Sequence, residues 1–233
     1  MIGLVIELLV SWLLLWFLEK KHLSALGFMP TPPRLLQLLS GFFVGSLFCA
    51  TYSVMMSSLT GNSWSLNNDF TVQQSLSSSW WVAKSVLFEE FIFRGALLYI
   101  LIQKTNTKLA CWISAIAFGL YHWFSFGVIG NPVLMIYVFI STGLWGWMYA
   151  LSFAKTKSLY LPVGLHFGWN LFSIIVFSQG PLGKQLLINS SSGQALTGTP
   201  SLMMALFQIV VLPAMVYTFL VWREKKLSTT STG

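Results

Sequence analysis

Long apolar stretches alternate with short polar segments along the whole chain. A helix that crosses the hydrocarbon core of a bilayer needs about 20 predominantly apolar residues, and seven stretches approach or exceed that length. The predicted membrane-spanning helices are 2–18, 35–58, 80–103, 109–124, 129–153, 159–178 and 202–222. The pattern predicts an all-α fold, a polytopic membrane helix bundle of about seven transmembrane helices, with six to eight as the range.

Polar segments separate these stretches. Residues 29–33 contain three prolines and break the chain between the first two helices. Residues 61–79 and 179–200 are polar and are expected to be loops. The first stretch has no basic segment before it and is followed directly by Glu19, Lys20 and Lys21. We therefore expect it to remain as a helix and not to be removed as a signal peptide.

The chain is expected to form one transmembrane helical domain, residues 1–227, with a disordered polar tail at 228–233. Hydrophobic residues make up 55% of the sequence and charged residues only 8%, against about 25% charged residues in a soluble domain. A soluble fold this apolar could not cover its own surface, so the expected partner of the outer surface is the lipid bilayer.

The basic residues follow the odd-numbered apolar stretches. Ten of the 13 lie there: Lys20, Lys21, Arg34, Lys104, Lys108, Lys155, Lys157, Arg223, Lys225 and Lys226. The positive-inside rule then predicts a multi-pass protein with the C-terminus in the cytoplasm and the N-terminus outside. A net charge of +7 therefore reflects orientation, and no nucleic-acid partner is predicted. The short loops suggest a prokaryotic cytoplasmic membrane.

Scarce ionisable side chains are concentrated inside the apolar stretches. The chain has six acidic residues and three histidines, and Glu89, Glu90, His122 and His166 all fall within or at the end of predicted helices, as does Glu7. Ionisable groups inside a bilayer are costly and almost always have a partner or a function. This concentration is the strongest functional signal in the sequence.

The third stretch carries Glu89, Glu90 and Arg94. Glu90 and Arg94 are spaced i, i+4 on one helix face, so we expect them to form an ion pair. The side chains of successive helical residues point about 100° apart around the helix axis, so Glu89 is expected to lie in different surroundings from Glu90. A purely structural role suits Glu90 and Arg94, whereas Glu89 is the candidate for chemistry.

The fourth and sixth stretches supply the other candidates. A lone His122 could be a satisfied core residue, and the i, i+4 pair His166 and Asn170 could be an interhelical hydrogen-bonding pair. Gly164 and Gly168 form a small-xxx-small pair that permits close helix approach. Counted from the nearest cytoplasmic lysines, Glu89, His122 and Asn170 lie at a similar depth of about 20 to 23 Å, with His166 one turn lower, so the four groups can converge.

Three motifs in this order resemble those of a known family. Glu89-Glu90-x-x-x-Arg94, Phe118-x-x-x-His122 and His166-x-x-x-Asn170 are similar to the motifs of the CAAX-protease and bacteriocin-processing family of intramembrane endopeptidases, related to the type II CAAX prenyl endopeptidases. The resemblance covers the predicted catalytic core, residues 84–177. It implies hydrolysis of a peptide bond in a membrane-associated or lipidated protein or peptide.

The resemblance and the residue chemistry together suggest a mechanism. Glu89 would act as general base on a water that His122 holds, and His166 and Asn170 would donate hydrogen bonds to the oxyanion. Glu90 and Arg94 would support the site. No cofactor is expected, although Glu89, His122 and His166 could form a catalytic zinc set; the absence of a His-Glu-x-x-His pattern favours the metal-free version.

Two other functions suit an intramembrane cluster of this kind. Glu and His relays also serve proton-coupled transporters, although transporters usually contain internal repeats, and no repeat of 20 to 50 residues is visible here. A catalytically inactive scaffold or immunity protein of the same fold is the second alternative. Cleavage of a peptide would distinguish the enzyme from both.

Overall fold

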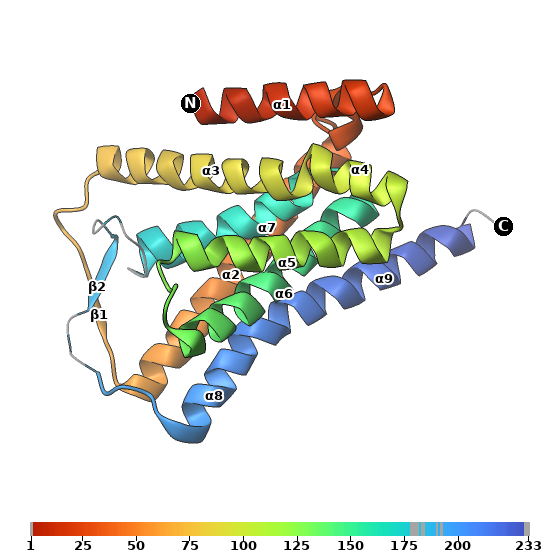
Figure 1. Cartoon of the computed structure of the whole chain (residues 1–233). Coiled ribbons are helices and arrows are strands. Elements are labelled where there is room, and N and C mark those ends of the chain that lie inside the picture. Colours follow the sequence, from red (N-terminus) through yellow and green to blue (C-terminus); the bar gives the residue numbers. More distant parts are fainter. Residues whose placement is uncertain (1, 178–181, 183–184, 190, 192, 231–233) are drawn as a thin grey trace.

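Helices dominate the computed structural model, which describes residues 2–177, 182, 185–189, 191 and 193–230 (Figure 1). The α-helices are α1 (Ile2–Glu19), α2 (Pro32–Thr60), α3 (Val72–Arg94), α4 (Ala96–Lys104), α5 (Thr107–Ser125), α6 (Pro132–Thr156), α7 (Tyr160–Leu171), α8 (Gly198–Leu206) and α9 (Leu212–Thr230). Short helical turns, η1 (Leu23–Leu26), η2 (Phe172–Val176) and η3 (Phe207–Val211), precede α2, extend α7 and join α8 to α9. The predicted all-α membrane helix bundle is confirmed.

Four of the described helices are long and apolar enough by themselves to cross a membrane. They are Ile2–Glu19, Pro32–Thr60, Pro132–Thr156 and Gly198–Ser228, and Tyr160–Val176 is a shorter apolar helix. The stretches predicted at 80–103 and 109–124 are helical but fall outside this group. The first of them is interrupted and carries the two glutamates and the arginine, which lowers its hydropathy.

The third predicted helix differs most from expectation. It begins at Val72, inside the segment predicted as a loop, because Thr71 and Gln74 form a capping box in which each side chain accepts a hydrogen bond from the other's backbone N–H. It ends at Arg94, and α4 follows after a break at Gly95. A Cβ at Gly95 would collide with the Phe91 carbonyl oxygen, so the break requires glycine.

The polar loops contain a short sheet that the sequence did not predict. β1 (Trp64–Leu66) and β2 (Leu187–Asn189) pair antiparallel, with Trp64 opposite Asn189 and Leu66 opposite Leu187. This hydrogen-bonded pair joins the loop before α3 to the loop before α8 at one end of the bundle (Figure 1). Three-residue strands separated by more than 100 positions carry too little pattern to be predicted from sequence.

The opposite end of the bundle gathers the segments that carry the basic residues. The ends of α1, α4 and α6 and the starts of α2, α5 and α7 all lie on this side (Figure 1). Lys104 at the end of α4 forms a 3.0 Å ion pair with Glu19 at the end of α1. The fold therefore supports the inference that these segments share one membrane face.

The C-terminal helix continues further than expected. Helix α9 extends to Thr230, so it includes the first three residues of the segment predicted to be a disordered tail. Residues 231–233 lie outside the described part of the chain.

Helices α2 and α7 pack with their backbones close together, and α7 is the helix that carries His166. A Cβ at Gly164 or Gly168 would collide with the α2 carbonyl of Leu38 or Phe42, and a Cβ at Gly45 would collide with the Leu165 carbonyl on α7. The close approach predicted from Gly164 and Gly168 is confirmed, with α2 as the partner. Glycines on both helices therefore set the position of α7 in the bundle.

Replacing Gly45 by Ala is expected to destabilise the protein by about 1–3 kcal/mol, because the added methyl overpacks a backbone contact. The matched control is Gly143→Ala, where a Cβ would meet only the Ala115 carbonyl oxygen at 3.6 Å, an ordinary contact. Thermal unfolding of both variants in the same detergent measures the difference. Equal midpoints for the two variants would contradict this account of the α2–α7 contact.

Candidate active site

A buried ion pair lies at the end of α3. Arg94 Nε lies 3.4 Å from Glu90 Oε2, and both side chains are fully buried. The spacing is the i, i+4 arrangement predicted from the sequence, and the ion pair is confirmed. Because a buried charge without a partner costs several kcal/mol, each of these two side chains needs the other.

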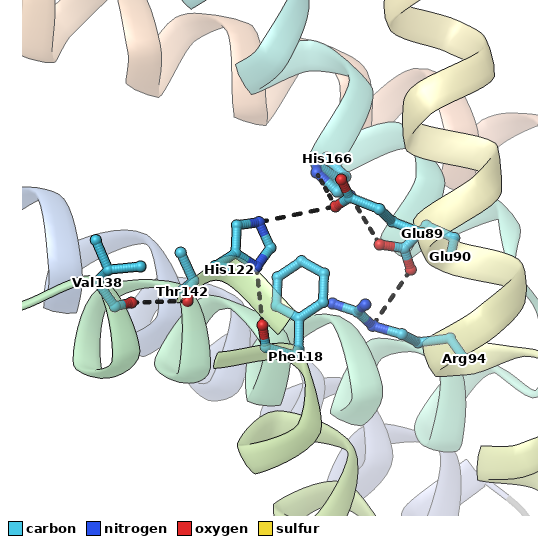
Figure 2. A network of polar contacts seen from close by, with 8 residues as sticks. All are labelled: Glu89, Glu90, Arg94, Phe118, His122, Val138, Thr142 and His166. Carbon is cyan, nitrogen blue, oxygen red and sulfur yellow. Dashed lines mark hydrogen bonds and ion pairs between the residues drawn. The ribbon is translucent and has the colours of Figure 1, made fainter. Parts of the chain in front are cut away.

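His166 from α7 reaches both glutamates of α3 (Figure 2). Its Nδ1 lies 2.8 Å from Glu90 Oε1, and its Nε2 lies 3.7 Å from Glu89 Oε2. The prediction that the two glutamates lie in different surroundings is therefore wrong, because both contact the same imidazole. Adjacent side chains leave the helix about 100° apart, but an imidazole from another helix has two nitrogens and can lie between two long carboxylate side chains.

His122 approaches Glu89 from α5. Its Nδ1 lies 2.8 Å from the Phe118 carbonyl oxygen one turn earlier. A carbonyl oxygen only accepts hydrogen bonds, so Nδ1 carries the proton and the neutral ring has its lone pair on Nε2. That Nε2 lies 3.9 Å from Glu89 Oε2.

Glu89 Oε2 thus lies between the Nε2 atoms of two histidines from two other helices (Figure 2). This oxygen is buried and has no hydrogen-bond partner among the described residues. Separations of 3.7 and 3.9 Å are too long for direct hydrogen bonds but suit a shared water. Three of the four predicted catalytic side chains are therefore brought together around one carboxylate oxygen.

Asn170 lies one turn beyond His166 on α7 and is half-buried. Its backbone carbonyl accepts a 3.3 Å hydrogen bond from the Ser173 hydroxyl. Within the described part of the chain, the contacts among Glu89, Glu90, Arg94, His122 and His166 do not include the Asn170 side chain. The partner of His166 is Glu90 from α3, and not the Asn170 side chain that the sequence suggested.

Aromatic rings enclose the Arg94 guanidinium. Its Cζ lies 4.1 Å from the ring centroid of Phe118, 5.0 Å from that of Tyr149 and 5.7 Å from that of Phe93. Cation–π attraction of this kind contributes about 2 kcal/mol when the cation is desolvated. Tyr149 lies on α6, which supplies none of the motifs, so the sequence contained no signal for its place in the site.

The residues of the alternative zinc set, Glu89, His122 and His166, do meet. However, no group of three or more His, Cys, Asp or Glu side chains in the described residues has an arrangement suited to a metal ion. The mechanism proposed below uses no metal ion.

Comparison with known proteins finds a similarity in the middle of the chain. Residues 74–172 match the family described as type II CAAX prenyl endopeptidase Rce1-like. YdiL of Bacillus subtilis (strain 168), described as a candidate membrane peptidase, is 28% identical over 112 residues. This match covers 48% of the chain and 41% of YdiL, so the chain matches less than half of the length of that relative. No solved structure matches.

These matches support the family that the three motifs predicted. The matched residues extend from the first turn of α3 to the end of α7 and contain Glu89, Glu90, Arg94, His122, His166 and Asn170. The whole polar cluster therefore lies within the part of the chain that carries the family resemblance.

Proposed function

From the similarity of residues 74–172 to the CAAX-type membrane peptidases, we propose that this protein is an intramembrane endopeptidase. Its substrate is a membrane-associated or lipidated protein or peptide. The observation that supports this most directly is the Glu89 carboxylate oxygen placed between two imidazole nitrogens inside the bundle. A carboxylate without a direct partner, next to two groups that can hold a water, is the arrangement that general-base hydrolysis needs.

The nucleophile is a water bound between Glu89 Oε2 and His122 Nε2. Because the proton of His122 is on Nδ1 and donated to Phe118, Nε2 accepts one hydrogen bond of this water while Glu89 accepts the other. The oxygen lone pair is then directed at the scissile carbonyl. Glu89 takes a proton as the water attacks and later returns it to the leaving amine.

The oxyanion of the tetrahedral intermediate is bound by His166 and Asn170. Glu90 Oε1 lies 2.8 Å from His166 Nδ1, so Nδ1 is held at Glu90, and Nε2 on the other edge of the ring is the nitrogen that is directed at the oxyanion. Loss of one such donor typically costs about 3–4 kcal/mol of transition-state stabilisation.

The reaction is metal-free, of the glutamic-peptidase type. Prolonged dialysis of the purified protein against EDTA and 1,10-phenanthroline is expected to leave the cleavage rate unchanged, because Glu89 itself activates the water. Elemental analysis of the same sample, before and after dialysis, provides the control for metal content. A rate that falls with the zinc content and returns on adding zinc would replace this mechanism by the zinc version.

The orientation follows from the charge placement. The end of the bundle that contains Lys104 and Lys155 faces the cytoplasm, together with the C-terminus, in a prokaryotic cytoplasmic membrane. The bilayer and a lipid-anchored substrate are the expected partners, and nucleic acid is not.

The proposal is tested by reconstituting the purified protein in liposomes with an internally quenched, prenylated peptide that ends in a CAAX-type sequence. Mass spectrometry of the products should show one cleaved peptide bond and addition of one water. A folded protein that cleaves neither this probe nor any small lipid-anchored protein of its host would instead favour the inactive scaffold. Proton flux coupled to solute uptake would favour the transporter.

A further inference from the structure

Tyr149 covers one face of the His166 imidazole. The two rings are stacked, with centroids 4.8 Å apart and planes only 16° from parallel. Tyr149 belongs to α6 and is 1% exposed, whereas His166 belongs to α7. No described ring other than that of Tyr149 stacks in parallel on either of the two histidines at the site; Phe118, for example, meets both edge-on, at 63° and 84°.

The Tyr149 ring is itself held on several sides. Trp145, one turn earlier on α6, contacts it edge-on at 6.2 Å, and Phe118 from α5 does so at 6.3 Å. The Arg94 guanidinium carbon lies 5.0 Å from its centroid. These contacts from two helices and a cation restrict the motion of the Tyr149 ring.

A second constraint on the imidazole is needed for a geometric reason. The hydrogen bond from Nδ1 to Glu90, 2.8 Å long, holds one edge of the ring, but tilting of the ring about the Cβ–Cγ bond of His166 still changes the direction of Nε2. A parallel ring against the face limits this tilting, since turning the imidazole would bring its edge toward the Tyr149 ring. With both constraints, Nε2 stays directed at Glu89.

We infer that Tyr149 is a positioning residue, whose aromatic face fixes the plane of His166 so that Nε2 points into the catalytic site. The kinetic part of this inference rests on the proposed peptidase function; the structural part does not. The role belongs to the ring and not to the hydroxyl, because the Tyr149 hydroxyl has no hydrogen-bond partner among the described residues. A phenylalanine at position 149 should therefore still hold the plane of His166, whereas an aliphatic side chain should not.

Nuclear magnetic resonance of the histidine side chains tests the structural part without a substrate. The chain has only three histidines, so selective labelling with ¹³C,¹⁵N-histidine gives a spectrum that can be assigned with His22→Gln and His166→Gln. In wild type, the carbon-bound ring protons of His166 should be shifted upfield by the stacked ring, and a protected Nδ1–H signal should report the bond to Glu90.

Tyr149→Phe is expected to keep both signals, and Tyr149→Leu is expected to lose the upfield shift and to broaden the Nδ1–H signal. Tyr149→Met serves as a second aliphatic variant should the Leu variant fail to fold. Met148→Leu, a volume-conserving change in the neighbouring fully buried residue, should leave both signals unchanged. An unshifted His166 in wild type, or an unchanged Nδ1–H signal in the aliphatic variants, would overturn the inference.

The kinetic part uses the quenched prenylated peptide in liposomes. The aliphatic variants should lose about tenfold or more in kcat with little change in KM, while Tyr149→Phe retains the wild-type kcat. A role in general stability alone would lower the yield or the unfolding temperature and leave kcat per folded molecule unchanged, which would overturn the assignment. Should wild type itself cleave nothing, the proposed function fails while the spectroscopic result still decides the role of the ring.

Discussion

Glu89→Gln is expected to lower kcat/KM for the lipidated peptide by about 10²–10⁴-fold, the range that general acid–base catalysis contributes. Glutamine keeps the size and the hydrogen-bonding oxygen of the side chain but cannot take a proton from the water. The protein should remain folded, because glutamine has the same size and Glu89 Oε2 makes no direct hydrogen bond among the described residues. Initial cleavage rates and unfolding temperatures of the two proteins are the measurements.

The matched control is Glu224→Gln, which changes a carboxylate that pairs with Lys155 at the surface, 2.6 Å away. A surface ion pair contributes little, so this variant should cleave at the wild-type rate. In the native host, peptides that keep extra residues only in the Glu89→Gln strain would identify the substrate. Full cleavage by purified Glu89→Gln would remove Glu89 from the mechanism.

Glu90→Leu is expected to destabilise the fold by about 3–5 kcal/mol, the usual cost of removing one partner of a buried ion pair. The Arg94 side chain is fully buried and would be left with aromatic rings but no anion. His166 would also lose the acceptor of its Nδ1 proton. The unfolding midpoint in detergent, together with the yield of folded protein, measures the effect.

The double variant Glu90→Leu with Arg94→Leu is the informative comparison. Removing both charges eliminates the uncompensated buried cation, so the double variant should be more stable than Glu90→Leu alone. It should still be inactive, because His166 has lost the carboxylate that orients its ring. A double variant that is less stable than both single variants would show that the pair contributes through packing and not through charge compensation.

The polar side chains of the site are connected to one another across the helices. Arg94, Glu90, His166, Glu89 and His122 form a continuous chain of polar contacts through three helices. Each of these groups has another polar group of the same chain of contacts as its neighbour. Charges arranged in this order can be tolerated inside a bilayer, which explains how a largely apolar chain holds five ionisable groups at one place.

Most of the helices, and most of the polar residues of the candidate site, could be predicted from the amino-acid sequence. Apolar stretches of membrane length can satisfy their backbone only as helices, so the bundle could be predicted without any knowledge of contacts. The i, i+4 spacing of Glu90 and Arg94 predicts their ion pair, because both residues belong to one helix. The Gly164 and Gly168 spacing predicts close packing of α7 for the same reason, although it does not identify α2 as the partner.

The contacts between groups on different helices could not be predicted in this way. Glu90 is the partner of His166, both glutamates reach the same imidazole, and Tyr149 stacks on it from a helix without a motif. These contacts depend on how α3, α5, α6 and α7 are rotated and positioned relative to one another, which the pattern along one helix does not encode. Local periodicity therefore predicts what each helix presents, whereas packing between helices determines the geometry on which the chemistry depends.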